Sequence, residues 1–78
     1  MSAMVELAER IEREDKYLID YLFDWAGLGP SQPWGAATSF ALEVAHGYGL
    51  IRGESDATLT ERGKEVVAAL RARASADQ

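Results

Sequence analysis

Histidine and cysteine, the side chains that most often perform catalysis or hold transition metals, are nearly absent from this chain. His46 is the only histidine, and there is no cysteine. No histidine pair, catalytic triad, thiolate nucleophile, disulfide framework or multi-histidine metal site is therefore expected. We expect His46 near the end of a helix, where a cation interacts favourably with the helix dipole, rather than at a catalytic centre.

Carboxylates and glycines are the other groups that could perform chemistry here. The carboxylates Glu6, Glu9 and Glu12 each have a cation four residues further along. That spacing is typical of a solvent-exposed helix face and not of a catalytic acid–base pair. The run Gly47-x-Gly49-x-x-x-Gly53 would join a helix to a strand, whereas a dinucleotide-binding loop joins a strand to a helix. We therefore predict no enzyme activity, no cofactor and no small-molecule substrate.

Chain length and net charge further restrict the possible size, location and binding partners of the protein. With 78 residues the chain is long enough for one small domain, which buries only about 60% of the surface of its unfolded form. Its apolar runs are shorter than the roughly 20 residues of a membrane span, and no signal peptide is visible, so we expect a cytoplasmic protein without membrane contact. The net charge of −5 disfavours nucleic acid, because phosphate neutralisation supplies most of that affinity. Seven carboxylates and three cations precede residue 27, so any surface that tolerates a polyanion lies in the second half.

Helical periodicity dominates residues 3–26. Apolar side chains recur there at three- and four-residue steps, which places them on one helix face. They are Met4, Leu7, Ala8, Ile11, Leu18, Leu22 and Trp25. Asp15 falls where the stripe should continue, so the segment forms either one long helix or two with a break near Glu14 and Asp15. The glycines and prolines of residues 27–33 end it.

A second helix is predicted from Pro33 or Trp34 to His46. Phe40 is expected to anchor the core from this helix. Its companions on the predicted buried stripe are Ala37, Ala41, Val44 and Tyr48. The positions predicted to be exposed are Thr38, Ser39, Leu42, Glu43 and His46.

A β-hairpin and a last helix should complete the domain. The hairpin is expected between Leu50 and Leu59 around a polar turn at 53–56, with Leu50, Ile51 and Leu59 covering the helices. Thr60 is a suitable N-cap for a helix that ends near Arg73, and Gly63 would allow it to pack closely. Its predicted buried positions are Val66, Val67, Leu70 and Ala74. Residues 74–78 are expected to form a frayed tail.

These elements resemble the C-terminal half of winged helix-turn-helix domains. The resemblance lies in two stretches, FALEVAHGYGLIR at 40–52 and TLTERGKEV at 58–66, and covers roughly residues 34–70. In that superfamily a recognition helix leads through a Gly-Leu-Ile-type segment into the first wing strand, and a Leu-Thr-x-x-Gly-type segment begins the next helix. The resemblance implies one mainly α domain over residues 1–78, with three or four helices and a two-stranded wing.

Winged-helix domains commonly bind DNA, which gives one functional hypothesis. DNA contact would use six polar or basic residues, Thr38, Ser39, His46, Arg52, Arg62 and Lys64. The predicted recognition helix, however, has no lysine or arginine to read base edges, and Glu54 and Asp56 in the wing turn would repel phosphate. A DNA-binding transcriptional regulator is therefore the alternative, and a protein-binding regulatory module is favoured.

Aromatic residues around the glycine–proline loop suggest where a protein could bind. Trp25 and Trp34 flank this loop and Leu28 lies within it, while Leu42 would extend the patch if it were exposed. Aromatic side chains dominate both cores and interfaces, so core packing is the favoured interpretation for the two tryptophans and an exposed patch that docks a partner is the alternative. The partner would be another protein or a second copy of the chain.

Overall fold

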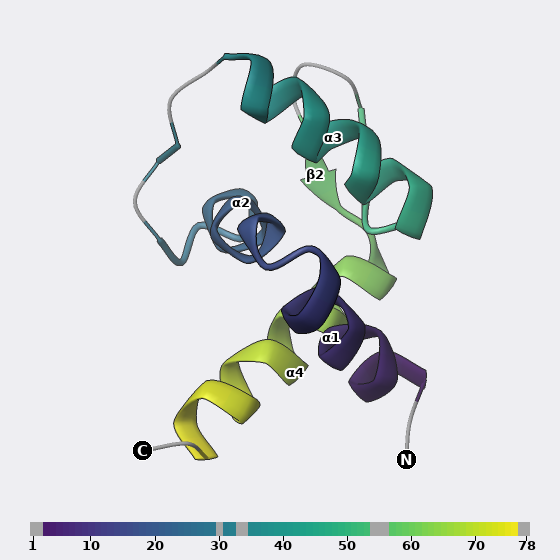
Figure 1. The fold of residues 1–78 in the computed structure, drawn as a ribbon, viewed down its shortest axis with the longest axis vertical. Coiled ribbons are helices and arrows are strands. Elements are labelled where there is room, and N and C mark those ends of the chain that lie inside the picture. The colour runs from purple at the N-terminus through teal and green to yellow at the C-terminus, as the bar shows by residue number, and fades with distance from the viewer. Residues whose placement is uncertain (1–2, 30, 33–34, 54–56, 77–78) are drawn as a thin grey trace.

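The computed structural model describes residues 3–29, 31–32, 35–53 and 57–76, and is mainly helical with one hairpin (Figure 1). The elements in chain order are α1 (Ala3–Glu14), α2 (Tyr17–Trp25), α3 (Ala36–Tyr48), β1 (Ile51–Arg52), β2 (Thr58–Leu59) and α4 (Glu61–Ala76). The two strands pair antiparallel, Ile51 opposite Leu59 and Arg52 opposite Thr58. This confirms the predicted combination of helices and a hairpin; of its predicted turn, residues 54–56 lie outside the described residues.

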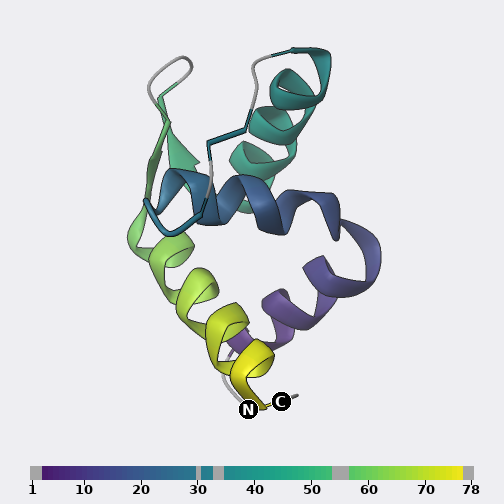
Figure 2. The same cartoon turned by 90° about the vertical axis from the view of Figure 1, so that its left-hand side faces the viewer.

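The helices are arranged around α2. Figure 2 shows α2 lying across the molecule, with α3 and the hairpin on one side of it and α1 and α4 on the other. α1 packs against α4, and α2 contacts α3, α4 and β2. Within the described ranges, no helix is long and apolar enough to cross a membrane.

Asp15 separates α1 from α2, so the alternative with two helices is the correct one. The backbone N–H of Asp15 donates to Ile11 and closes α1, and its carbonyl oxygen accepts from Leu18 and begins α2. Its carboxylate accepts a hydrogen bond of 2.5 Å from the hydroxyl of Tyr48 in α3. This bond, together with partial burial, raises the pKa of Tyr48, because both favour the protonated phenol.

One apolar cluster joins all the elements except β2 through fully buried side chains. Its buried members are Ala8, Ile11, Leu18, Leu22, Ala41, Leu42, Ala45, Leu50, Ile51, Val66, Val67 and Leu70. Leu59 of β2 is half-buried against this cluster, so Leu50, Ile51 and Leu59 cover the helices as predicted.

The predicted orientation of α3 is wrong by about a quarter turn. Its buried residues are Thr38, Ala41, Leu42 and Ala45. Phe40, expected to anchor the core, is 56% exposed, and Ala37 is exposed as well. Val44 and Tyr48 are half-buried. Apolar residues occur on almost every face of this helix, so the sequence pattern does not select one, and the closely packed side of α3 takes the smaller alanines.

The start of α4 agrees with the prediction. The hydroxyl oxygen of Thr60 accepts from the backbone N–H of Gly63 at 3.1 Å, which is the N-cap interaction, and donates to the carbonyl of Gly49 at 2.7 Å. A Cβ on Gly63 would lie 2.1 Å from the carbonyl oxygen of Leu50, so only glycine fits this close approach. Val66, Val67 and Leu70 are buried as expected, whereas Ala74 is exposed.

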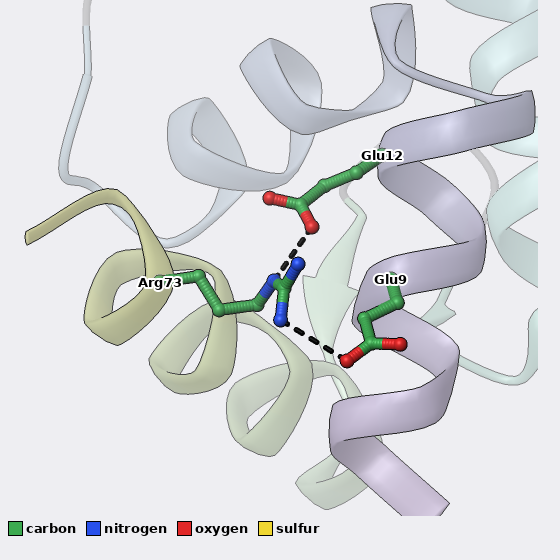
Figure 3. A network of polar contacts seen from close by, with 3 residues as sticks. All are labelled: Glu9, Glu12 and Arg73. Atoms are coloured by element: carbon green, nitrogen blue, oxygen red, sulfur yellow. Dashed lines mark hydrogen bonds and ion pairs between the residues drawn. The ribbon is translucent and has the colours of Figure 1, made fainter. Parts of the chain in front are cut away.

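The end of α4 departs from the prediction of a frayed tail after Arg73, because the helix continues to Ala76. Arg73 bridges to α1, donating to Glu12 at 2.6 Å and to Glu9 at 3.1 Å (Figure 3). Glu9 and Glu12 are half-buried in this contact, so the predicted solvated face of α1 is partly an interface. The bridge holds the last turns of α4 against α1 and favours their helical conformation.

Candidate protein-docking groove

The four residues predicted to contact a protein have different environments. Leu28 is 51% exposed after the end of α2, and Trp25 is half-buried there with its ring 5.9 Å from that of Tyr21. Leu42 is only 9% exposed, so the prediction that it is exposed on α3 is wrong and it does not extend the patch. Trp34 lies outside the described residues. Trp25 and Leu28 therefore locate the candidate site.

The chain reversal after α2 orients Leu28 outwards. Gly27 adopts a left-handed conformation (φ 74°), which side-chain-bearing residues rarely take. The N–H of Gly27 donates to Asp24, and the N–H of Leu28 donates to Phe23. These two bonds form a Schellman motif, which is commonly accompanied by an apolar contact such as the one Leu28 can make with Phe23. The local sequence thus fixes the backbone that presents Leu28.

Leu28 belongs to a groove between the end of α2, β2 and the first half of α4. One hollow, of about 690 Å³, is lined by Trp25, Ala26, Arg52, Thr58, Leu59, Glu61 and Lys64. A second, of about 200 Å³, is lined by Ala26, Leu28, Leu59, Lys64, Val67, Ala68 and Arg71. A third, of about 130 Å³, lies between Phe23, Leu28 and Arg71. Neighbouring hollows share lining residues, and the three together are called the groove.

One stripe of α4 forms a wall of the groove. Lys64, Val67, Ala68 and Arg71 follow the spacing i, i+3, i+4, i+7, which places them on one face of the helix. Val67 is buried at the base, whereas Lys64 and Arg71 are exposed at the edge. Val67 was predicted only as a core residue and Arg71 was not predicted to contact a protein, although their spacing with Lys64 and Ala68 on one helix face is visible in the sequence.

The charge of the groove differs from that of the whole chain. Its lining includes the cations Arg52, Lys64 and Arg71 and a single carboxylate, Glu61. Among the described lining residues, three positive charges and one negative charge give +2, whereas the whole sequence carries −5. Lys64 lies 3.6 Å from Glu61 in an exposed pair, which contributes little stability. Arg52 and Arg71 form no ion pair with any residue in the described part of the chain.

The residues predicted to contact DNA do not form one surface. Thr38 is only 4% exposed, so the prediction that it faces a ligand is wrong. Ser39 and His46 are exposed on α3, and His46 hydrogen-bonds through Nε2 to the carbonyl of Gly53 at 2.7 Å. Arg62 and Lys64 are two residues apart on α4, so they point in opposite directions, about 200° apart around the helix.

Arg62 lies on the side of α4 that faces α3. It donates to the carbonyl of Tyr48 at 3.3 Å, close to the end of that helix. Lys64, in contrast, lines the groove with Arg52. The three cations predicted to contact phosphate, Arg52, Arg62 and Lys64, are therefore divided between two sides of the molecule.

The outward face of α3 is aromatic and carries no positive charge from lysine or arginine. The exposed ring of Phe40 lies 5.6 Å from that of Tyr17, centroid to centroid, and Glu43 is exposed on the same face. Burial raises the pKa of the Tyr17 phenol, and the nearby carboxylate of Asp15 raises it further. This face offers apolar contact and negative charge, and both are unsuited to a phosphate backbone.

Other kinds of site find no support among the residues that the structure describes. No group of three or more histidine, cysteine, aspartate or glutamate side chains there could hold a metal ion. No buried side-chain nitrogen or oxygen in the same ranges is without a hydrogen-bond partner. Comparison with protein-family models, with curated proteins and with solved structures finds no match. The features of the groove that bear on function are its apolar base, with Leu59 and Val67, and its basic edge, with Arg52, Lys64 and Arg71.

Proposed function

We propose that this protein is a small, non-enzymatic, protein-binding regulatory module built on a winged-helix-like scaffold. The scaffold is supported by the order of three helices, a hairpin and a fourth helix. It is supported also by the two segments of the resemblance, since Gly49 ends α3 in a left-handed conformation and Gly63, in the first turn of α4, packs against Leu50. A cytoplasmic location fits this proposal.

The groove is the observation that carries the proposed function. Exposed Leu28 and half-buried Trp25 border this groove, whose base is apolar and whose edge is charged. Protein interfaces have this composition, with an apolar centre that includes aromatic anchors and a polar rim. A protein segment can fill such a groove, whereas a small molecule would find an open site with little to enclose it.

DNA binding is the second candidate function, and the exposed cations Arg52, Arg62 and Lys64 favour it. Against it stand the division of these cations between two sides of the molecule and the absence of lysine and arginine from α3. We expect no duplex-DNA binding tighter than about 10 µM at physiological salt, against the roughly 10 nM or better of specific complexes. A fluorescence-anisotropy titration at two salt concentrations measures this.

The proposed function is tested by affinity capture from native cells with three versions of the full chain. These are the unaltered protein, Leu28→Asp, and Ser39→Asp as the control, because Ser39 is exposed outside the groove and an acidic residue suits the first turn of α3. A partner of the groove is lost with Leu28→Asp and retained with Ser39→Asp, and the purified partner then binds directly with the same dependence. Nanomolar, sequence-dependent DNA binding that is lost with Arg52→Ala or Arg62→Ala would instead establish the alternative.

A further inference from the structure

We infer that the groove binds an acidic amphipathic segment of its partner, with apolar side chains against Trp25 and Leu28 and carboxylates against Arg52, Lys64 and Arg71. The inference rests on the proposed function and adds to it the chemistry of the partner. Two properties of the groove support it, its dimensions and its charge.

The groove has the length of a short helical segment. From Lys64 to Arg71 the wall of α4 extends seven residues, or about 10 Å at a rise of 1.5 Å per residue. About two turns of a partner helix match this length, and the hollow beside Arg52 extends it further. Leu28, Leu59 and Val67 line the central part, so an occupant must present apolar side chains on one face. Helices with one apolar face bind such grooves through residues spaced three and four apart.

The charge of the groove selects acidic flanks for that segment. Arg52 and Arg71 are exposed and form no ion pair with the described residues, and the only ionic contact of Lys64 there is the long one to Glu61. Arginine binds carboxylates through two parallel hydrogen bonds, which gives direction as well as attraction. A nucleic-acid backbone would supply negative charge but would leave the apolar base of the groove unfilled.

A second copy of the chain is a less suitable occupant. Its acidic N-terminal helices bury their apolar stripes, as Ile11, Leu18 and Leu22 are fully buried. An apolar surface with a nearby carboxylate occurs on the outward face of α3, where Phe40 and Glu43 are exposed. Contact between that face and the groove would join copies head to tail, and an arrangement of this kind forms open chains unless the rotation closes.

The test uses three fluorescent twelve-residue helical peptides that share one leucine face and differ only in their flanks, which carry glutamate, glutamine or lysine. Binding to the full chain is measured by anisotropy, and the contact is located by the NMR shift of the Trp25 indole. We expect the glutamate peptide to bind about tenfold more tightly than the glutamine peptide, since three ion pairs of modest strength add to the apolar contact. The lysine peptide should not bind measurably.

Two charge-reversal variants locate the effect. Arg71→Glu should weaken the glutamate peptide about fivefold, because one attraction becomes a repulsion, while Arg13→Glu, an exposed site on α1 with the same change of net charge, should not alter binding. Leu28→Ser should also weaken it. Both Arg71 and Leu28 are exposed, so circular dichroism should show an unchanged fold.

Each other outcome overturns the inference in a different way. Equal binding of the three peptides, or no binding of any, shows that the groove does not select acidic segments. If Leu28-dependent capture of a partner persists in that case, the proposed function stands and only the inference fails. If duplex DNA shifts the NMR signal of the Trp25 indole, the groove is a binding site for polyanions. Self-association that is lost in both Phe40→Ser and Arg71→Glu shows that the occupant is a second copy.

Discussion

Gly47 near the end of α3 and Gly63 in the first turn of α4 are both helical glycines, but their surroundings are opposite. A Cβ at Gly63 would lie 2.1 Å from the carbonyl oxygen of Leu50 and 3.2 Å from a side-chain carbon of Leu59, whereas nothing lies within 4 Å of a Cβ at Gly47. Glycine costs about 1 kcal/mol relative to alanine inside a helix. At Gly63 the close approach of the Leu50 backbone requires a glycine in spite of this cost. At Gly47 no neighbouring atom requires one.

The two glycines mark two kinds of surface in this small domain. Around Gly63, hydrogen bonds of 2.7 to 3.1 Å join the end of α3, the residue before β1 and the start of α4, since Thr60 binds Gly49 and Gly63 through its side chain and Leu50 through its backbone N–H. Around Gly47, the outward face of α3 is open to solvent. This junction, formed by Gly49, Leu50, Thr60 and Gly63, is therefore expected to contribute more to stability than the open surfaces, including the groove.

The largest effect is expected for Gly63→Ala. The new methyl group must displace the backbone at Leu50, which also accepts the hydrogen bond from Thr60. We expect a loss of about 3 kcal/mol or more in the free energy of unfolding, because overpacking against backbone is poorly relieved. A small domain has only about 5–15 kcal/mol in total. Urea denaturation followed by circular dichroism measures the change.

Gly47→Ala is the matched control for this prediction. It makes the same chemical change in a helix without a steric contact, so it should stabilise the protein by up to about 1 kcal/mol. Opposite signs for the two variants would support the contrast between the junction and the outward face. If both variants stabilised the protein, the close packing of Gly63 against Leu50 would be wrong.

An intermediate effect is expected for Thr60→Ala. The substitution removes the N-cap bond to Gly63 and the bond to the carbonyl of Gly49, and loss of an N-cap costs about 1–2 kcal/mol. Thr60→Ser keeps the hydroxyl and should retain most of the stability. A serine variant as unstable as the alanine variant would show that the threonine methyl group, and not the cap, contributes the stability. Thermal denaturation of the two variants side by side measures the difference.

The junction was predictable from the sequence because its determinants are local. Threonine before a helix and glycine in its first turn can be recognised without knowledge of distant residues. The predicted N-cap role of Thr60 and the predicted close packing at Gly63 are both confirmed. The sequence showed an interruption at Asp15 but did not decide between one long helix and two, since the hydrogen-bond partner of Asp15, Tyr48, is 33 residues away. The continuation of α4 to Ala76 was missed for a similar reason, because Arg73 is held by Glu9 and Glu12 of α1.

The groove was predictable only in part. Trp25 and Leu28 were identified because they lie at the glycine–proline loop and because aromatic residues dominate interfaces as well as cores. Lys64 was predicted to contact DNA, and neither Lys64 nor Arg71 was predicted to contact a protein. Their common wall depends on the tertiary contact of α4 with the end of α2, which local periodicity does not specify. The predicted orientation of α3 was wrong because the face with Ala37 and Phe40 and the face with Leu42 are both apolar, and so the hydrophobic pattern alone allows more than one buried side.

The smallest effect is expected for Phe40→Ala, and it decides the orientation of α3. In the orientation predicted from the sequence, Phe40 is a core residue whose removal would cost about 3–5 kcal/mol. In the structure its ring is 56% exposed and contacts Tyr17, and an aromatic pair contributes about 0.5–1.5 kcal/mol. Alanine has the higher helix propensity and offsets part of that loss. We therefore expect a net change below about 1 kcal/mol in urea denaturation.

Leu42→Ala is the control for Phe40→Ala, two residues further along the same helix. Leu42 is 9% exposed and belongs to the core, so its truncation should cost about 2–5 kcal/mol. The ratio of the two effects is more informative than either value, because a rotation of α3 by one residue would exchange their environments. A Phe40→Ala variant less stable than Leu42→Ala would place the phenylalanine inside and return the outward face of α3 to Leu42. It would also remove the aromatic surface that argues against DNA on this face.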